Sequence, residues 1–183
     1  NKSLQEYSEQ LSSGNVELNS LQNQLDSVKK EKESLETRLS QVSGADGNNK
    51  LLTAVIKAAN LYISNDSTGA AEAIADVDVS SLPVEEAKTL YNTISGATMM
   101  NAANDLYNRG MTAYNKADYT TAADLLVRAY KCDKTKADAV FYAAKSYVAL
   151  NQPDNAKKYY QIIADEFKSS GYVTEAQAYV QSH

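Results

Sequence analysis

Residues able to do catalytic chemistry are few and scattered in this chain. It has one histidine, His183, which is its last residue, and one cysteine, Cys132. A Ser-His-Asp triad would therefore depend on the last position of the sequence. One cysteine and one histidine cannot supply the four ligands of a structural zinc site, and no glycine-rich phosphate loop is present.

Carboxylates are the most numerous group that could act in acid-base catalysis. The 23 aspartates and glutamates show no spacing that singles out a catalytic pair. We therefore expect no enzymatic activity, no metal site and no cofactor. Cys132 is expected to be a packing residue near the end of a helix.

The charge balance argues against a nucleic-acid partner. The chain has a net charge of -5 at pH 7, whereas binding to phosphates requires a clustered basic face. Glutamates interleave with the close lysines Lys29, Lys30 and Lys32, which is typical of an exposed helix face.

A block of sequence that returns after 34 residues shows how the chain is organised. Residues 115–134 align with residues 149–168. The paired positions carry small residues where two helices would approach closely and large apolar residues where the gap must be filled. They are Gly110, Ala113, Ala122, Leu126 and Ala129 in the first copy, and Ala144, Tyr147, Ala156, Tyr160 and Ile163 in the second. A period of this length predicts stacked helical hairpins.

Turn residues support the same interpretation. Pro153 stands where the second helix of its hairpin should begin, a position at which proline loses no helical hydrogen bond. Asp118 occupies the equivalent place one repeat earlier and can cap free backbone amides.

A weaker third copy precedes these two. Ala58, Leu61, Ala70, Ile74 and Val77 reproduce the internal spacing. We therefore predict a degenerate repeat at 50–82, an extra helix at 83–100, repeats at 103–136 and 137–170, and a capping helix at 174–182. Because Ser95-Gly96 offers a break, residues 83–116 fit either one helix or two.

The first 43 residues have a different, seven-residue period. Two apolar seams run through about six heptads, which predicts a coiled-coil stalk. The seam residues are Leu4, Tyr7, Leu11, Leu18, Leu21, Leu25, Val28, Leu35, Leu39 and Val42. Gly14 and Lys32 interrupt them.

A lone helix of this pattern would expose its leucines, so we expect the chain to form a homo-oligomer through residues 1–43. Dimer and trimer both remain open. In a parallel dimer Glu31 would approach Glu36 of the partner, a repulsive contact unless Lys32 lies between them. A hairpin folding at residues 12–15 is a less favoured alternative. Residues 44–49 have the composition of a linker to the repeats.

The repeat positions resemble those of the tetratricopeptide family. The match is imperfect, because Lys134 stands where the family usually has proline and Ala113 where it usually has an aromatic residue. The resemblance implies an all-α solenoid whose first helices line a groove for an extended peptide or another protein. Carried over position by position, the groove residues are Asn104, Tyr107, Asn108, Met111, Tyr114, Asp138, Phe141, Tyr142, Lys145 and Val148.

The family's basic clamp for a carboxyl terminus is not reproduced, because Asp138 stands where a second cation would be expected. Single aromatic residues of the groove could instead pack between neighbouring helices. We therefore expect a non-enzymatic protein-binding scaffold on an oligomeric stalk. The alternative is a structural spacer whose solenoid packs on itself or on a fixed neighbour.

The order of coiled coil, linker and repeats also resembles envelope proteins that couple the Tol-Pal system to bacterial cell division. This resemblance implies a location in the bacterial cell envelope, outside the cytoplasm. Because the chain begins at Asn1, we expect an N-terminal piece to have been removed, and any membrane attachment to be through that piece. A cytoplasmic location is the alternative.

Overall fold

The computed structural model describes residues 2–41 and 46–183, and the side chains of residues 3, 5–7, 9–37 and 50–183 within them. Every regular element of this described part is helical, and no strand occurs in it. The all-α fold expected from the sequence is therefore confirmed. The chain divides into two compact units, residues 1–96 and 97–183, and the boundary falls inside one long helix.

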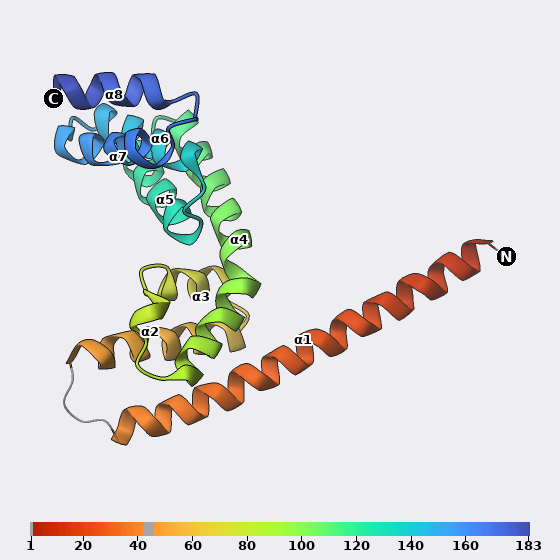
Figure 1. Ribbon diagram of the computed structural model, residues 1–183. Helices are drawn as coiled ribbons and strands as arrows, with labels where there is room; N and C mark the ends of the chain where they lie inside the picture. The colour runs from red at the N-terminus through yellow and green to blue at the C-terminus, as the bar shows by residue number, and fades with distance from the viewer. Residues whose placement is uncertain (1, 42–45) are drawn as a thin grey trace. The chain divides into compact units, whose positions relative to one another are not determined.

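Unit 1 begins with the 40-residue helix α1 (Lys2–Gln41). It continues with α2 (Asp46–Ile63), α3 (Ser67–Ile74), the short 3-10 helix η1 (Val79–Ser81) and the first part of α4 (Glu85–Asn115). Helices α2 and α3 form a hairpin, and α1 packs against α2 (Figure 1).

The core of unit 1 is built from the apolar faces of its four α-helices and from Leu82, which follows η1. Its fully or nearly fully buried side chains include Val28 and Leu35 of α1. The others are Leu52, Val55, Ile56, Ala58, Ala59, Ala70, Ala71, Ile74, Leu82, Ala87, Leu90 and Ile94. The second half of α1 is thus part of a folded unit.

The course of α4 and the start of α2 decide two boundaries that the sequence left open or placed elsewhere. Helix α4 runs without interruption from Glu85 to Asn115, so the segment that fitted either one helix or two is one helix. An interior glycine costs a helix only about 1 kcal/mol relative to alanine, which a 31-residue helix tolerates at Gly96. Helix α2 begins at Asp46, inside the segment predicted as a linker, and aspartate is favoured in the first turn of a helix.

Unit 2 contains the end of α4 followed by α5 (Tyr119–Cys132), α6 (Ala137–Ala149), α7 (Pro153–Glu166) and α8 (Val173–Ser182). From α5 to α8, each helix packs on the next, as in a solenoid (Figure 1). The end of α4 with α5 lies within the predicted repeat at 103–136, and α6 with α7 within that at 137–170. Helix α8 stands at the position of the predicted capping helix.

Small residues let the helices of unit 2 approach closely. Gly110 of α4 faces α5, and a Cβ at that position would lie 2.8 Å from Leu126 Cγ, which is too close for two carbon atoms. Ala122, Ala129 and Ala144 are fully buried at the other contacts. The repeating small residues therefore mark sites where a larger side chain would push two helices apart.

The turns of the three hairpins are alike. Each has one residue with a positive φ, and the amide of the next residue donates to the carbonyl five residues earlier, which is the Schellman pattern. The left-handed residues are Asn65 (φ 64°), Ala117 (φ 59°) and Asn151 (φ 55°). The corresponding bonds run from Asp66 to Leu61, from Asp118 to Ala113 and from Gln152 to Tyr147, at 2.8, 3.0 and 2.9 Å.

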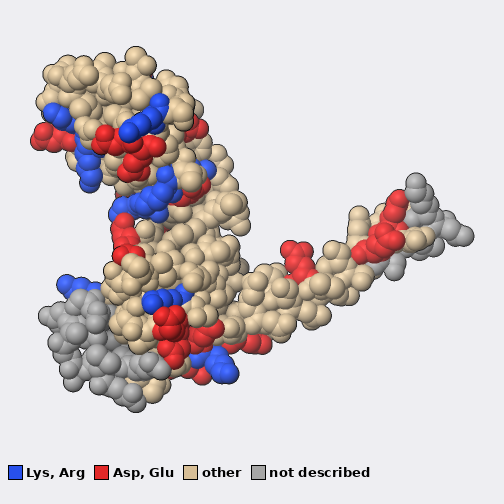
Figure 2. Space-filling view, viewed as in Figure 1, with Lys and Arg blue, Asp and Glu red and all other residues tan. Residues whose placement is uncertain are grey.

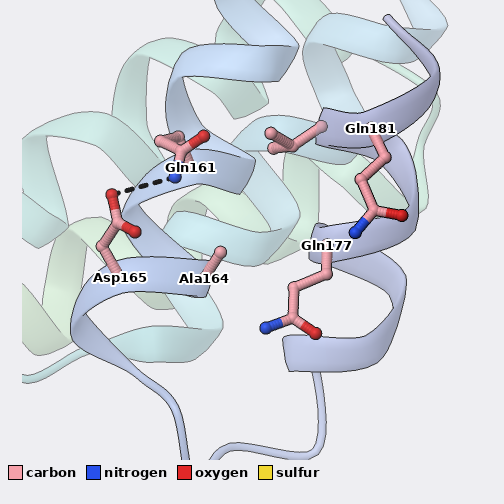
Figure 3. A pocket seen from close by; sticks show the side chains of 6 residues that line it. Gln161, Ala164, Asp165, Gln177 and Gln181 are labelled. Carbon is pink, nitrogen blue, oxygen red and sulfur yellow. Dashed lines mark hydrogen bonds between the residues drawn. The ribbon is translucent and has the colours of Figure 1, made fainter.

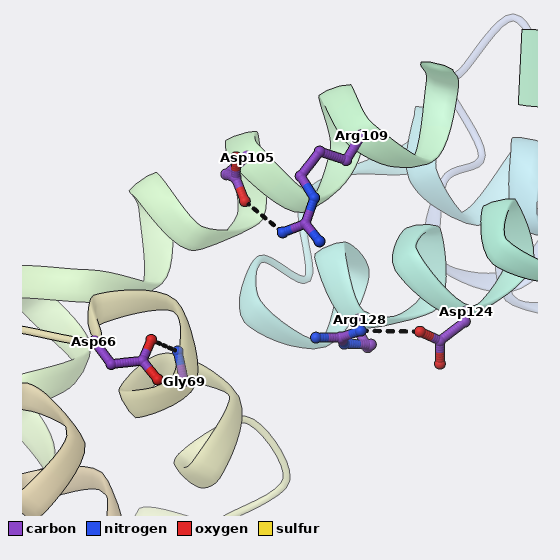
Figure 4. Close-up of polar contacts among 6 residues, drawn as sticks. All are labelled: Asp66, Gly69, Asp105, Arg109, Asp124 and Arg128. Carbon is purple, nitrogen blue, oxygen red and sulfur yellow. Dashed lines mark hydrogen bonds and ion pairs between the residues drawn. The ribbon is translucent and has the colours of Figure 1, made fainter. Parts of the chain in front are cut away.

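Aspartates begin two of the helices that follow these turns. The Asp66 carboxylate accepts a bond from the Gly69 amide at 2.8 Å, and Asp118 accepts one from the Thr121 amide at 3.2 Å. Pro153 begins α7, where no side chain caps the helix. Ion pairs one turn apart, Arg109 with Asp105 and Arg128 with Asp124, lie on the surfaces of α4 and α5 (Figure 4).

Ala117 is the one left-handed turn residue of the three that is neither asparagine nor glycine. Its Cβ crowds the backbone in this conformation, so we predict that Ala117→Gly raises the free energy of unfolding by about 0.5–1 kcal/mol. The matched control is Ala178→Gly at an exposed helical position of α8, which should lower it by a similar amount. Chemical denaturation of the two variants measures both effects. Equal destabilisation by both changes would contradict the turn geometry.

Candidate functional site

The candidate groove residues of α4 form a stripe along one side of the helix in unit 2. Asn104 and Asn108 are exposed, while Tyr107, Met111 and Tyr114 are half-buried. Met100 lies seven residues before Tyr107, two turns away on the same side, and is 72% exposed. Sequence reasoning did not include Met100, although its spacing from Tyr107 carried the signal.

Aromatic rings connect the α4 stripe to α6. Tyr114 makes edge contacts with Tyr119, at 5.5 Å between ring centroids, and with Tyr142, at 5.1 Å. Tyr142 in turn contacts Phe141 at 5.5 Å. The structure therefore brings Tyr114, Tyr142 and Phe141 of the predicted groove together in one aromatic cluster.

The chain's own C-terminal segment engages three of the α6 groove residues. The Tyr172 ring stacks on Phe141 with 4.1 Å between centroids, and Phe141 is only 5% exposed. Lys145 Nζ lies 3.4 Å from Glu175 Oε1 and 5.2 Å from the centre of the Phe141 ring. The Tyr172 hydroxyl bonds to Asp138. Phe141 is therefore covered, whereas Asp138 stays exposed and the Lys145 side chain is 37% exposed.

Val148, the last of the carried-over groove residues, is 43% exposed. It borders a cleft of about 410 Å³ with Asn151, Gln152, Pro153, Tyr179 and His183. The ring of His183 stacks on Tyr179 at 4.1 Å in this cleft. Val148 thus lies at the edge of a separate hollow.

One lysine side chain contacts two residues of the α4 stripe. Lys136 donates to the Asn104 side chain at 2.8 Å and lies 5.7 Å from the centre of the Tyr107 ring. Charges of both signs are interspersed on the face shown in Figure 2. The stripe therefore offers tyrosine, methionine and asparagine to a partner.

Hydrogen bonds and burial raise the pKa values of several tyrosines in unit 2. The bond from Tyr172 to Asp138 and the burial of the ring raise the pKa of Tyr172 to about 12. Burial and then the 2.9 Å bond to Glu166 raise the pKa of Tyr130 to about 12. Burial, with the charges of Asp138 and Tyr142, raises the pKa of Tyr107. These hydroxyls stay protonated as hydrogen-bond donors at neutral pH.

A second cleft, of about 330 Å³, lies between α7 and α8 (Figure 3). Its lining is mostly polar: Gln161, Ala164, Asp165, Gln177, Val180 and Gln181. Gln161 donates to Asp165 across one turn of α7 at 2.9 Å. Asp165 is the single carboxylate of this cleft, and the cleft beside His183 has none. Neither therefore holds a pair of carboxylates for acid-base chemistry.

The seam residues of α1 fall into two groups. Tyr7, Leu11, Leu18 and Leu21 are 53–69% exposed, and Leu25 is half-buried. Val28 and Leu35 are fully buried in unit 1. Leu4, Leu39 and Val42 lie outside the side chains that the structure describes.

Cys132 is buried at the end of α5. Over residues 2–41 and 46–183, no group of three or more histidine, cysteine, aspartate or glutamate side chains could hold a metal ion. None of the helices in the same ranges is both long enough and apolar enough to cross a membrane.

Comparison of the chain with protein-family models, with curated proteins and with solved structures gives no match in any of the three.

The Tyr172–Asp138 bond gives stability a pH dependence that can be tested. Tyrosine has a pKa near 10 when unfolded, so protonated Tyr172 contributes stability below about pH 10 and loses it as the pH rises through 12. We predict that Tyr172→Phe is less stable than the native chain at pH 8, and that this difference narrows between pH 10 and pH 12.

Denaturant melts of both proteins across this pH range measure the difference. Asp138→Asn removes the charged acceptor but keeps the shape of the side chain. The stability difference between the native chain and this variant should also narrow between pH 10 and pH 12. A difference that stays constant from pH 8 to pH 12 would contradict the bond's role.

Proposed function

We propose that this protein is a non-enzymatic scaffold that binds another protein or an extended peptide on the α4 stripe of unit 2. The observation that carries the proposal is the row of Met100, Asn104, Tyr107, Asn108 and Met111, which are exposed or half-buried on one side of α4. Tyrosine and methionine supply adaptable apolar contact area, and asparagine supplies hydrogen bonds to a backbone.

The resemblance of the hairpins to tetratricopeptide repeats supports the same proposal. The three turns share one backbone geometry, and small residues recur at the helix contacts. In that family the first helix of each hairpin lines the binding groove, and α4 is the first helix of its hairpin here. The proposed binding surface is narrower than the family's, because Tyr172 and Glu175 engage the equivalent positions of α6.

Self-association through α1 is the second part of the proposal. It would place several α4 stripes in one assembly, so that a partner with repeated binding segments gains avidity without new contacts. The proposed setting is the bacterial cell envelope, and the support for it is the resemblance in domain order alone.

One observation favours the alternative function, that of a structural spacer. Helix α8 and the turn before it engage Asp138, Phe141 and Lys145, so three of the five groove residues on α6 contact the chain's own C-terminal segment. A solenoid whose contacts are all internal would need no exchangeable ligand. The two functions differ in whether the α4 stripe binds a peptide.

Selection from a displayed library of random peptides tests this difference. We predict that the native chain enriches peptides and that Tyr107→Ala/Met111→Ala weakens their binding at least about tenfold, because side chains at the centre of a contact dominate its affinity. Both residues are half-buried, so the double variant keeps most of the helix packing.

The matched control is Asp105→Ala/Arg109→Ala, which changes two exposed residues with the same spacing on the other side of α4. It should leave peptide binding unchanged. Failure to enrich any peptide, or equal losses in the two double variants, would favour the spacer.

A further inference from the structure

The first half of α1 exposes a row of large apolar side chains. Tyr7 is 65% exposed, Leu11 69%, Leu18 68% and Leu21 53%. They recur at steps of three, four and seven residues, so they lie on one side of the helix. Such a row is unusual on a protein surface unless a partner covers it.

The same side of the helix is covered in its second half. Leu25 and Lys32 are half-buried, and Val28 and Leu35 are fully buried. Lys32 forms a 3.2 Å ion pair with Glu36, one turn away on α1 itself. The exposed row is therefore continuous with an interface inside unit 1, and the change from exposed to buried occurs around Leu25.

We propose that a second copy of this chain covers the exposed row by pairing its own α1 over Tyr7 to Leu25, while residues 28–35 stay packed in their own unit 1. The stalk is then a short junction of about three heptads, roughly 28 Å long at 1.5 Å per residue. This deepens the proposed function by defining which part of α1 joins the copies.

The residues beside the exposed row suit a second α1. In a parallel pair Gln10 would face Asn15 of the partner, and Glu17 would face Gln22. No two like charges meet in these heptads. Over the next heptads Glu31 would face Glu36 of the partner, which is repulsive, and there Glu36 already has Lys32 as its neighbour in the same chain.

The buried half cannot pair with a second copy without leaving its own unit. Val28 and Leu35 have no exposed surface, so a coil of six heptads would have to remove both side chains from the core of unit 1. The apolar surface that this removal exposes in unit 1 would offset the apolar surface that the longer coil buries. Pairing therefore stops where burial begins.

Sedimentation equilibrium of the full chain over a range of concentrations tests this proposal. We expect the mass to rise from one copy toward two, and Leu18→Glu to raise the dissociation constant at least about tenfold by placing a charge in the seam. Val16→Glu is the matched control, because Val16 is 67% exposed on the opposite side of the same helix. It should leave the dissociation constant unchanged.

A third variant, Lys32→Leu, locates the end of the paired segment. In a six-heptad coil it would replace a polar seam residue and tighten association at least about tenfold. If pairing ends near Leu25, position 32 lies outside the paired segment, and the dissociation constant of Lys32→Leu should stay within about twofold of the native value. Tighter self-association of Lys32→Leu would contradict a paired segment that ends near Leu25. A native chain that remains a single copy at all concentrations would contradict pairing through α1 altogether.

Failure of self-association through α1 is distinguishable from failure of peptide binding on the α4 stripe. All three substitutions lie on α1 in unit 1, whereas the peptide selection measures binding to the α4 stripe of unit 2. If the native chain remains a single copy but still enriches peptides, the proposed binding function stands and the proposed pairing through α1 is wrong.

Discussion

An α-helix with one apolar side needs another surface to cover that side, and this requirement governs most of the packing in the described structure. In unit 2 each helix from α5 to α7 packs against the next one. The helices must also approach closely. Gly110 of α4, for example, faces Leu126 of α5 with no room for a Cβ. The outward side of α8 carries mostly polar or small residues, such as Gln177 and Gln181, as is typical of a capping helix.

The same requirement separates the two halves of α1. Val28 and Leu35 find cover inside unit 1, and Leu11, Leu18 and Leu21 find none within the described chain. A heptad pattern states which side of a helix is apolar and says nothing of what covers it. For that reason the sequence indicated one continuous seam, although the structure divides it.

Much of the fold could be predicted because its determinants are local. The cap at Asp118 and the proline at the start of α7 each depend on residues close together in the chain, and the period of 34 residues is visible as a repeat in the sequence itself. The uninterrupted course of α4 could not be predicted, since the helical cost of Gly96 is only about 1 kcal/mol and a Ser-Gly pair fits either a break or a continuous helix. Asn65 and Asn151 are residue types that tolerate a left-handed turn, whereas Ala117 gives no such signal.

The candidate site was predictable in part for the same reason. Tyr107, Met111 and Tyr114 share a side of α4 because of helical spacing alone, and the structure leaves that side accessible. The cover over Phe141 and Lys145 comes from Tyr172 and Glu175, about 30 residues further along the chain. No period or motif links those positions, so only the folded chain reveals that the C-terminal segment contacts part of the expected groove.

Amide hydrogen exchange along α1, measured at low and at high protein concentration, tests most directly how the chain covers its apolar surface. The account predicts that residues 28–35 are protected at both concentrations, because their cover belongs to the same chain. Residues 7–25 should become protected only at the high concentration, when a second copy is present. Protection that changes with concentration to the same extent along the whole of residues 7–35, or in neither half, would contradict the account.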